Sequence, residues 1–374
     1  MSENFDSFSI IEPIRRAIAQ IGFKTPTPIQ TLVIPLILAN KDIIAIAETG
    51  TGKTAAFCIP VLQQSYYKPE NRRGKRKLKA LILAPTREIA LQIGEHFDVI
   101  GKHTGLQNLV IYGGIKQGKQ ADVLHNGVDI LIATPGRFLD LYKQNLIPVN
   151  TLQVLVIDEA DRMLNMGFEK EVLEILTKLP PARQSLLFSA TMNERILELS
   201  KKVLRKPIIV NGTSEKAIPV SIQQKVYLVE EIGKKDVLLS ILRKNDFKKV
   251  LIFTPTIFAT KEITHFLKSN NHPAAEIHSD KSQNTRQITL SDFRNNKIKI
   301  LVGTDIMARG IDVDDIDLVV NFNIPNKPET FIHRIGRTGR AGKIGLAISL
   351  CGEKELDHFK AIELLLGEKI EVVE

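Results

Sequence analysis

Short runs of apolar, mostly β-branched residues recur along the chain and alternate with longer segments of helical periodicity. Most of these runs are continuously apolar, which is typical of parallel strands buried on both faces of a sheet. The pattern predicts an α/β fold formed twice, with a mainly parallel sheet flanked by helices in each half. The predicted strands are Ile43–Ile46, Ala80–Ala84, Asn108–Tyr112, Asp129–Ala133, Val154–Ile157 and Ser185–Phe188, then Lys225–Val229, Val250–Phe253, Ala275–His278, Ile298–Val302, Leu318–Asn321 and Leu346–Leu350.

A polar stretch separates the two sets of strands. Residues 204–221 are rich in charged and turn-forming residues, and no strand–helix unit begins again until about Gln223. We therefore predict an N-terminal domain at residues 1–211, a linker at 212–219 and a C-terminal domain at 220–374.

Glycines, prolines and charged residues follow the six strands of the first half. Because ligands of open parallel sheets bind beyond the carboxyl ends of the strands, this edge is the predicted functional face. Core packing alone does not explain such a gathering of residues. The segments that follow the strands are 47–54, 85–88, 113–114, 134–137, 158–161 and 189–191.

The first of these segments, Ala-x-x-x-x-Gly-Lys-Thr, is close to the pattern of a phosphate-binding loop. Backbone N–H groups of a glycine-rich turn face phosphate oxygens, and the next helix N-terminus favours their charge. Lys53 would reach the β- and γ-phosphates, and the Thr54 hydroxyl would hold Mg²⁺. The alternative is a simple glycine turn, and Ala47 departs from the glycine that usually opens the pattern. The predicted nucleotide-binding residues of the loop are Ala47, Glu48, Thr49, Gly50, Thr51, Gly52, Lys53 and Thr54.

A Mg²⁺–nucleotide site also needs carboxylates on a neighbouring strand, and Asp158 and Glu159 directly follow a predicted strand. We assign Asp158 and Glu159 to the Mg²⁺ site, with Glu159 also orienting and deprotonating the attacking water. A helix start capped by acidic residues is the alternative interpretation. The phosphate loop earlier in the sequence favours the catalytic interpretation of Asp158 and Glu159.

The segment His333–Arg340 contains three arginines and two glycines in eight residues. Such a segment makes a poor solvated helix face and a good phosphate clamp, since arginine stabilises the charge of a phosphoryl transition state. Arg337 and Arg340 are the predicted arginine fingers. With Lys53 in one domain and these arginines in the other, ATP turnover would require domain closure. A basic RNA-facing loop is the alternative.

With these motifs in order, the chain resembles the DEAD-box family of ATP-dependent RNA helicases over about residues 5–350. Asp158-Glu159-Ala160-Asp161 matches the string that names the family, and residues 22–30 resemble its Q motif. The resemblance implies two RecA-like domains, ATP and Mg²⁺ as cofactors, and RNA-stimulated ATP hydrolysis. It also implies that Gln30 reads the adenine edge and that Phe5 and Phe23 line the base pocket.

Further matches imply residues that couple the nucleotide state to RNA. Ser189-Ala190-Thr191 matches the motif that links ATP to strand separation, and its hydroxyls would contact the segment 158–161. Residues 303–312 match motif V, which implies a ribose contact for Asp312. Phe322 and Asn323 depart from the family's Asn-Tyr-Asp-x-Pro, so no contact is assigned to them. The implied coupling residues are Asp161, Ser189, Thr191, Arg309, His333 and Arg334.

The remaining edge segments, by the same resemblance, line one strand of RNA. Arginines and helix N-termini suit phosphates, and glycines let the backbone approach closely. Trp is absent and aromatic residues make up 6% of the chain, so we expect sequence-independent binding of a single strand or a short duplex. The implied RNA-binding residues are Pro85, Thr86, Arg87, Gly113, Gly114, Thr134, Pro135, Gly136, Arg137, Gln283, Arg286 and Thr304.

Composition narrows the class of protein and the compartment in which it is expected to work. The chain has 374 residues, is 43% hydrophobic and 25% charged, and contains only Cys58 and Cys351. These values are typical of globular domains and exclude a disulfide scaffold or a cysteine-built zinc site. The start of the chain lacks the apolar segment of a signal peptide, and no apolar run approaches the ~20 residues that span a bilayer. We expect a cytoplasmic monomer without a membrane partner.

The net charge of +9 is unevenly distributed. Residues 1–210 carry 27 basic and 20 acidic residues, whereas residues 211–374 carry 24 and 22. The segment 68–79 alone has seven basic residues and one acidic residue. It is interpreted either as a solvated loop or as a flexible arm that adds salt-sensitive, sequence-blind RNA affinity.

The leading hypothesis is an ATP-dependent RNA helicase that closes on RNA and locally unwinds short duplexes. An ATP-gated RNA clamp with little unwinding would use the same site and stays open as an alternative. A DNA-directed ATPase of the same superfamily is disfavoured by the Q motif, and a small-molecule P-loop kinase leaves the second half unexplained. The compact chain and its basic insert resemble bacterial RhlE-type members. About two dozen residues follow Leu350 and predict one helix at Glu353–Leu366. We therefore expect either a protein partner, such as a ribosome-assembly or RNA-decay protein, or the basic insert to select the RNA, and not an appended domain.

Overall fold

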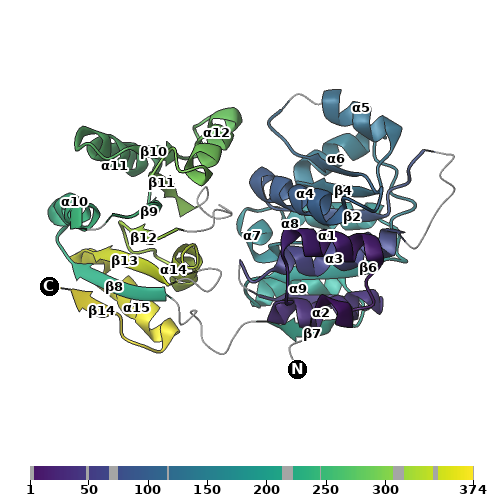
Figure 1. Ribbon diagram of the computed structural model, residues 1–374, viewed down its shortest axis with the longest axis horizontal. Coiled ribbons are helices and arrows are strands. Elements are labelled where there is room, and N and C mark those ends of the chain that lie inside the picture. The colour runs from purple at the N-terminus through teal and green to yellow at the C-terminus, as the bar shows by residue number, and fades with distance from the viewer. Residues whose placement is uncertain are drawn as a thin grey trace. The chain divides into compact units, whose positions relative to one another are not determined.

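The chain separates into two compact units, Met1–Thr213 and Ser214–Glu374, each built around one sheet. The structure is a computed structural model that describes residues 4–47, 50–66, 75–115, 118–212, 222–244, 246–305, 316–339 and 344–373 (Figure 1). Apart from Gly212, the predicted linker at 212–219 lies outside the described residues.

The first unit alternates strands and helices, as the apolar pattern predicts. Its strands are β1 (Ile43–Ile46), β2 (Ala80–Leu83), β3 (Asn108–Ile111), β4 (Ile130–Ala133), β5 (Val154–Ile157), β6 (Gln184–Ser189) and β7 (Ile208–Asn211). Its helices are η1 (Phe5–Ser7), α1 (Glu12–Ile21), α2 (Pro28–Leu38), α3 (Lys53–Tyr66), α4 (Arg87–Gly101), α5 (Gly118–Asn126), α6 (Pro135–Lys143), α7 (Ala160–Asn165), α8 (Glu169–Lys178) and α9 (Glu194–Val203).

Helices cover both faces of the first sheet, which explains its uninterrupted apolar strands. In β2, Ala80 and Ile82 pack into a core with α1, α2, α3 and α4. The alternate residues Leu81 and Leu83 pack into a second core, to which α6, α7, α8 and α9 contribute. Because side chains alternate between the faces of a strand, the central strands β2, β4, β5, β6 and β1 supply both cores.

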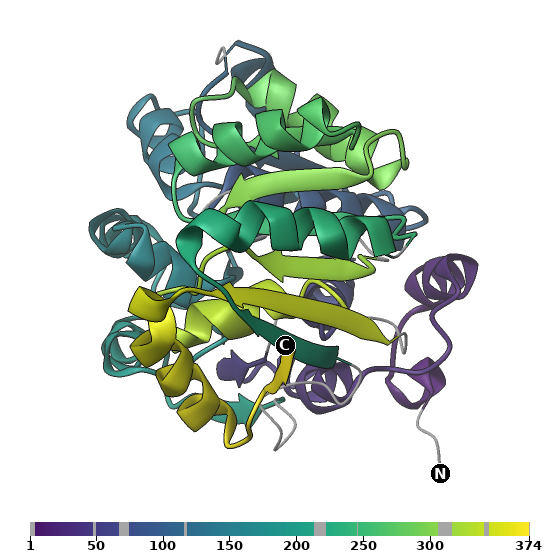
Figure 2. The ribbon, with the colours of Figure 1, turned by 90° about the vertical axis from the view of Figure 1, so that its left-hand side faces the viewer.

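The second unit repeats this plan. Its strands are β8 (Ile222–Leu228), β9 (Val250–Thr254), β10 (Ala274–Ile277), β11 (Ile300–Thr304), β12 (Leu318–Asn321), β13 (Gly345–Cys351) and β14 (Glu371–Val373). Its described helices are η2 (Glu231–Gly233), α10 (Lys234–Lys244), α11 (Ile257–Ser269), α12 (Gln283–Arg294), α14 (Pro328–Ile335), η3 (Glu353–Glu355) and α15 (Leu356–Leu366). Figure 2 shows α10 and α11 lying across the face of this sheet that is turned to the viewer.

The two sheets have the same topology. The strand order is β3-β4-β2-β5-β6-β1-β7 in the first unit and β10-β11-β9-β12-β13-β8-β14 in the second. Counted from the first strand of each unit, both orders are 3-4-2-5-6-1-7. All the strand pairs that the structure describes are parallel. The predicted fold class, two tandem parallel sheets flanked by helices, is confirmed.

Two edge strands are missing from the sequence-based prediction, and some strand ends shift. β7 lies in the stretch interpreted as irregular and pairs with β1, whereas β14 pairs with β8 near the end of the chain. The strand predicted at 225–229 begins at Ile222, and the one predicted at 298–302 begins at Ile300. In the part of the chain that the structure covers, none of the helices has the length and hydropathy to cross a bilayer.

Candidate functional site

The strand order of the first sheet sorts the predicted site residues into two groups at one edge. β1, β6 and β5 are consecutive in the sheet, and the segments after them carry the phosphate loop, Ser189-Ala190-Thr191 and Asp158-Glu159. β2, β4 and β3 are also consecutive, and the segments after them carry the residues assigned to RNA. Chain order does not reveal this grouping, because the three segments assigned to RNA separate the phosphate loop from the segments that follow β5 and β6.

The phosphate loop turns back on itself. Lys53, the first residue of α3, is 6% exposed, and its ammonium group donates a hydrogen bond of 2.7 Å to the Ala47 carbonyl. Gly50 and Gly52 both have φ of +91°, the left-handed region that only glycine adopts without strain. The predicted loop residues Glu48 and Thr49 lie outside the described residues.

The Q-motif segment packs directly on this loop. Gln30 is 4% exposed; its Nε2 donates to the Gly52 carbonyl at 3.1 Å, and its Oε1 accepts from the Thr27 backbone N–H at 2.9 Å. A Cβ at Gly52 would lie 2.5 Å from Gln30 Nε2, so glycine is required there for contact as well as for φ. The predicted partners Phe5 and Phe23 come together, with stacked rings whose centroids are 6.4 Å apart.

Asp158 is a buried carboxyl group at the end of β5. Burial raises the pKa of Asp158 to about 7, and the charge of Glu159 adds to this, while the charge of Lys53 lowers it. Burial also raises the pKa of Asp161, against the charge of Lys53 and hydrogen bonds from the backbone of Arg162 and Ala190. Lys53 therefore lies close enough to both carboxyl groups for their charges to interact, although it follows a different strand.

Glu159 has a strained backbone and a side-chain partner that sequence reasoning missed. Its φ of +49° and ψ of 50° are left-handed values, which are unusual for a residue with a side chain. Its carboxylate forms an ion pair of 3.1 Å with Arg162, and both side chains are largely buried. Arg162 follows Asp161 within α7, so only its spacing from Glu159 pointed to this pair.

The Ser189-Ala190-Thr191 segment is close to the carboxylates by a different contact from the one predicted. The Ser189 hydroxyl is buried and donates to the Thr191 carbonyl at 2.8 Å, within the same segment. The recorded link to Asp161 is a hydrogen bond from the backbone of Ala190. Ser189 therefore uses its hydroxyl to close its own turn, and a contact of the Thr191 hydroxyl with the segment 158–161 stays a prediction.

The RNA-assigned residues of the first unit occupy helix starts and an exposed glycine loop. Pro85 precedes Thr86, which caps α4 and accepts from the Ile89 N–H at 3.4 Å, and Arg87 begins that helix. In the same way, Thr134 lies at the N-cap of α6, with Pro135 and Gly136 in its first turn. These helix N-termini favour anions.

Arg137 braces the loop that follows β3. Its Nη2 donates to the Ile115 carbonyl at 2.9 Å. Gly113 and Gly114 are exposed, and a Cβ built at either would meet no atom within 4 Å. Only Gly114 has a positive φ, of +83°, so the fold itself does not require glycine at Gly113.

In the second unit, Arg334 is a buried hub. It is 2% exposed and pairs with Asp305 through Nε at 2.5 Å and Nη2 at 2.8 Å. Its Nη1 donates to the Asn321 side chain at 3.1 Å and to the Asn323 carbonyl at 2.8 Å. Arg334 thus connects α14 to the ends of β11 and β12.

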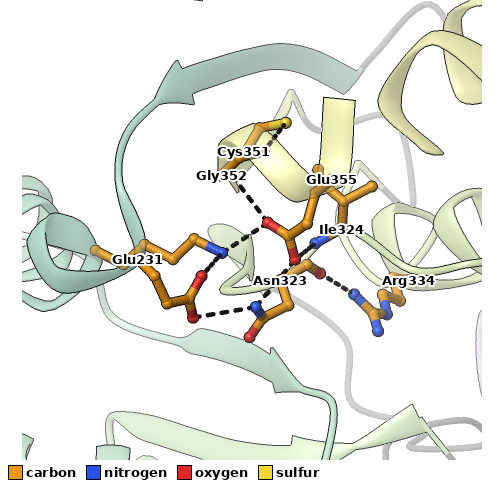
Figure 3. A network of polar contacts seen from close by, with 8 residues as sticks. Glu231, Asn323, Ile324, Arg334, Cys351, Gly352 and Glu355 are labelled. Carbon is orange, nitrogen blue, oxygen red and sulfur yellow. Dashed lines mark hydrogen bonds and ion pairs between the residues drawn. The ribbon is translucent and has the colours of Figure 1, made fainter. Parts of the chain in front are cut away.

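A second set of polar side chains continues from this hub (Figure 3). Lys234 is fully buried and contacts the carboxylates of Glu355 at 2.7 Å and Glu231 at 2.8 Å. Asn323 Nδ2 donates to Glu355 at 3.0 Å and to Glu231 at 3.5 Å. Sequence reasoning assigned nothing to Lys234, Glu231 or Glu355, because no motif contains them.

The other predicted residues of the second unit are only partly covered. Arg337 is 3% exposed, and its Nε donates to the His333 carbonyl at 3.3 Å. Thr304 ends β11, and Gln283 and Arg286 lie in the first turn of α12. Three further predicted residues of this unit, Arg309, Asp312 and Arg340, lie outside the described residues.

The basic segment 68–79 is less available to RNA than its composition suggests. Lys79 is 8% exposed and donates to the Ser65 carbonyl at 2.8 Å, and Arg76 forms an ion pair of 2.5 Å with the buried Asp129. These two side chains hold β2 and the chain before it in place. The expectation of one continuous flexible arm is therefore wrong at its C-terminal end, whereas residues 67–74 lie outside the described residues.

Comparisons with known proteins identify both units. The family model "DEAD/DEAH box helicase" matches residues 27–199, and "Helicase conserved C-terminal domain" matches residues 233–342. The chain is 36% identical to the DEAD-box ATP-dependent RNA helicase RhpA of Helicobacter pylori over 371 residues, 99% of this chain and 74% of that protein. It is 38% identical to the DEAD-box ATP-dependent RNA helicase CshA of Bacillus licheniformis, over 99% of this chain and 75% of that protein.

The fold matches solved structures of the same kind. S. cerevisiae Dbp5 bound to RNA and ADP BeF3 superposes with a TM-score of 0.88 at 30% identity, covering 99% of this chain and 95% of that chain. The RhlE-type subgroup stays a prediction. The two family matches, the relatives and the paired parallel sheets agree, and the chain belongs to the DEAD-box ATP-dependent RNA helicases, enzymes that hydrolyse ATP.

Proposed function

We propose that this chain couples RNA-stimulated ATP hydrolysis to closure of its two units on one RNA strand, and so opens short duplexes locally. The observation that carries the proposal is the division of one sheet edge into two neighbouring groups. Phosphate-loop and carboxylate residues follow β1, β6 and β5, and phosphate-seeking arginines and glycines follow β2, β4 and β3. One edge would then hold a nucleotide and a nucleic-acid backbone side by side.

In the nucleotide half, Lys53 would leave the Ala47 carbonyl and bind the β- and γ-phosphates. Gln30 would read the adenine edge, and Phe5 and Phe23 would bound the base pocket. Glu159 would orient the attacking water and accept its proton. Its ion pair with Arg162 holds the carboxylate in one place, and its left-handed backbone is the kind of strain found at functional positions.

The residues present fit a magnesium ion. Thr54 and Asp158 offer oxygen atoms, the ligands that Mg²⁺ prefers, and Glu159 adjoins Asp158. Within the described residues, no group of three or more His, Cys, Asp or Glu side chains forms a metal cage. That agrees with Mg²⁺, which is usually held by one or two protein oxygens together with substrate phosphates and water. When bound, the ion would neutralise phosphate charge, and Asp158 would be held ionised by it.

In the RNA half, the starts of α4 and α6 and the loop at Gly113 and Gly114 would contact successive phosphates. These contacts involve backbone groups and arginines, so they carry no base preference. The structure of Dbp5, which is 30% identical to this chain, contains RNA and ADP BeF3. This similarity supports the assignment of both ligands.

Closure would bring the arginines of α14 and the loop after it to the nucleotide of the first unit. Arg337 would supply positive charge to the transferring phosphoryl group, together with Arg340. Arg337 is buried against the His333 carbonyl in the second unit, so its engagement would require rearrangement or local exposure. Arg334 would act indirectly, by fixing the ends of β11 and β12 through Asp305 and Asn323.

ATP hydrolysis by the pure protein tests this function, measured with and without a single-stranded RNA and with the matching DNA. We expect RNA to raise the rate and DNA to leave it near the basal value. Lys53→Ala should abolish turnover, and Glu159→Gln should abolish hydrolysis while the protein retains ATP and RNA in a long-lived complex. An ATPase rate that no RNA changes would contradict the proposal.

A strand-displacement assay separates unwinding from clamping. A short RNA duplex with a fluorescent strand should separate in an ATP-dependent manner, and a duplex several times longer should separate much more slowly. RNA-stimulated ATP hydrolysis without any displacement would instead support the ATP-gated clamp. Glu159→Gln serves as the matched control, because it can bind both ligands but cannot complete the cycle.

A further inference from the structure

Arg87 is a buried cation that has no anionic partner among the described residues. Its side chain is 9% exposed, and its Nε and Nη1 are buried without a hydrogen-bond acceptor in the part of the chain that the structure describes. None of the described carboxylates forms an ion pair with it. Burying a charge without a partner is unfavourable, so the free protein holds this guanidinium at a cost.

The guanidinium of Arg87 contacts the aromatic ring of Tyr112. Arg87 Cζ lies 4.1 Å from the centroid of the Tyr112 ring, well within the range of a cation–π interaction. Tyr112 follows β3 and directly precedes Gly113 and Gly114. The stack therefore joins the start of α4 to the glycine loop.

A ring on the face of a guanidinium restrains it without consuming its donors. Arginine binds phosphate through its N–H groups. The Tyr112 ring contacts the guanidinium at Cζ and offers no oxygen acceptor to those groups. A carboxylate in place of Tyr112 would hold Arg87 equally well but would use up the N–H groups. The contact with Tyr112 restrains Arg87 and leaves its Nε and Nη1 without acceptors among the residues that the structure describes.

Tyr112 is itself fixed by its backbone. Its carbonyl accepts a hydrogen bond of 3.3 Å from Nε2 of Gln120, a buried residue of α5. Three residues further on, Arg137 donates to the Ile115 carbonyl at 2.9 Å. The loop that carries the ring is thus attached on both sides of Gly113 and Gly114.

We propose that Tyr112 is a positioning residue for RNA binding, whose ring orients the Arg87 guanidinium so that its N–H groups meet an RNA phosphate. The inference rests on the proposed RNA-binding function of this edge. Tyr112 makes no contact with RNA in this scheme and acts through Arg87. A purely structural role, in which the stack only joins α4 to β3, predicts loss of stability and no selective effect on RNA.

The test measures RNA affinity and RNA-stimulated ATP hydrolysis with the full chain and a fluorescein-labelled single-stranded oligouridylate. Tyr112→Leu removes the ring face and should raise the Kd and the RNA KM by about ten-fold, the scale of a partly desolvated cation–π interaction. The kcat at saturating RNA should stay close to the wild-type value. The midpoint of thermal unfolding should fall by only a few degrees, because the ring also contacts Arg87 in the free protein. Tyr112→Phe keeps the ring and should retain wild-type affinity. If Tyr112→Leu does not fold, Tyr112→Met carries the same expectation with a longer side chain.

A double-mutant cycle with Arg87→Ala separates positioning from independent effects. Tyr112→Leu should add nothing to the RNA affinity lost in Arg87→Ala. As a matched control, Tyr142→Leu removes a ring that stacks on Phe138, with centroids 6.0 Å apart, and should leave the RNA KM unchanged. Wild-type affinity in Tyr112→Leu, or full additivity with Arg87→Ala, overturns the inference while the RNA function stands. Unchanged affinity in Arg87→Ala overturns both the RNA role of Arg87 and the inference.

Discussion

The side-chain amide of Asn323 donates from Nδ2 to the carboxylate of Glu355, over 3.0 Å. The same amide nitrogen lies 3.5 Å from Glu231, and both carboxylates contact the buried ammonium of Lys234. Two negative charges therefore share one lysine, and the position of Asn323 favours a donor. The usual family residue there is Asp, so the departure at Asn323 is matched by its local charges.

We expect Asn323→Asp to destabilise the second unit. The change replaces a donor with a third carboxylate beside Glu231 and Glu355, which removes two hydrogen bonds and adds repulsion. The loss should be about 1–2 kcal/mol in the free energy of unfolding, measured by urea denaturation.

Two variants check the cause of that loss. Asn326→Asp, an exposed change three residues further on, should cost less than about 0.5 kcal/mol. Adding Glu231→Gln to Asn323→Asp should restore part of the stability, because it removes one repulsive charge and supplies a donor. Equal stability of Asn323→Asp and the wild type would show that the local charges do not select asparagine.

The raised pKa of Asp158 predicts a pH dependence of stability in the absence of nucleotide and metal. Burial raises the pKa of Asp158 from an ordinary value of 3.8 to about 7, so the folded protein keeps a proton that the unfolded chain has lost between these values. Its contribution to stability therefore falls as the pH rises through this window, by up to about 1.4 kcal/mol per pH unit, and levels off above pH 7.

Asp158→Asn should remove this component. Urea denaturation from pH 5 to 8.5 should show a flatter profile for the variant and a higher stability than the wild type above pH 7. ATP hydrolysis should be lost at the same time, since the amide carries no charge for the Mg²⁺ shell. A variant whose pH profile runs parallel to that of the wild type would mean that another group titrates.

Gly136→Ala should separate stability from RNA binding. Gly136 lies in the first turn of α6, has no positive φ, and has open space where a Cβ would stand. Alanine should leave stability unchanged or raise it by about 0.5 kcal/mol. RNA affinity should nevertheless fall, because the new methyl group would stand where a phosphate backbone approaches.

Gly127→Ala is the contrasting variant for the same experiment. Gly127 has φ of +82°, and a Cβ there would lie 2.4 Å from the Arg76 carbonyl oxygen. It should cost about 1–3 kcal/mol of stability and leave the RNA affinity of the folded fraction unchanged. Wild-type RNA affinity in Gly136→Ala would remove α6 from the RNA-binding surface.

Selective neutralisation of the basic segment should reduce the salt dependence of RNA binding. We expect Lys68, Arg72, Arg73 and Lys75, changed together to Ala, to flatten the plot of log Kd against log salt by about 0.7 per lost phosphate contact with single-stranded RNA. ATP turnover at saturating RNA should be preserved. An unchanged slope would favour a loop that is merely solvated.

The C-terminal part of that segment should behave differently. Lys79→Ala and Arg76→Ala break the contacts with the Ser65 carbonyl and Asp129. Each should lower the free energy of unfolding by about 1–3 kcal/mol without a matching change in the salt slope. Thermal unfolding and fluorescence anisotropy measure the two effects separately.

The repeated parallel sheets follow from the sequence because strands buried on both faces are continuously apolar, as in Ala80–Leu83. β7 escaped prediction because it is a four-residue edge strand, in which Ile208 and Ile209 remain exposed. Its place beside β1 depends on pairing across the chain, which local pattern does not encode.

The candidate site was predictable where chemistry is written in consecutive residues, as for Lys53 and the pair Asp158-Glu159. It was not predictable where distant residues meet. Two such contacts are the cation–π pair of Arg87 and Tyr112 and the hydrogen bond from Asn323 to Glu355. Each joins segments that are far apart in the sequence and meet only in the folded chain. Net charge was also a poor predictor of the RNA-binding surface, because Arg76 and Lys79 bind Asp129 and the Ser65 carbonyl within the protein.

The two native thiols determine how the proposed domain closure could be measured with fluorescent labels. Cys58 and Cys351 are almost fully buried, burial raises the pKa of Cys351 to about 11, and burial together with Asp158 raises the pKa of Cys58. Because the thiolate is the reactive form, both should resist maleimide dyes at neutral pH. A single exposed cysteine introduced into each unit would therefore accept a donor and an acceptor fluorophore in the otherwise native chain, and energy transfer between them would follow the ATP cycle in real time.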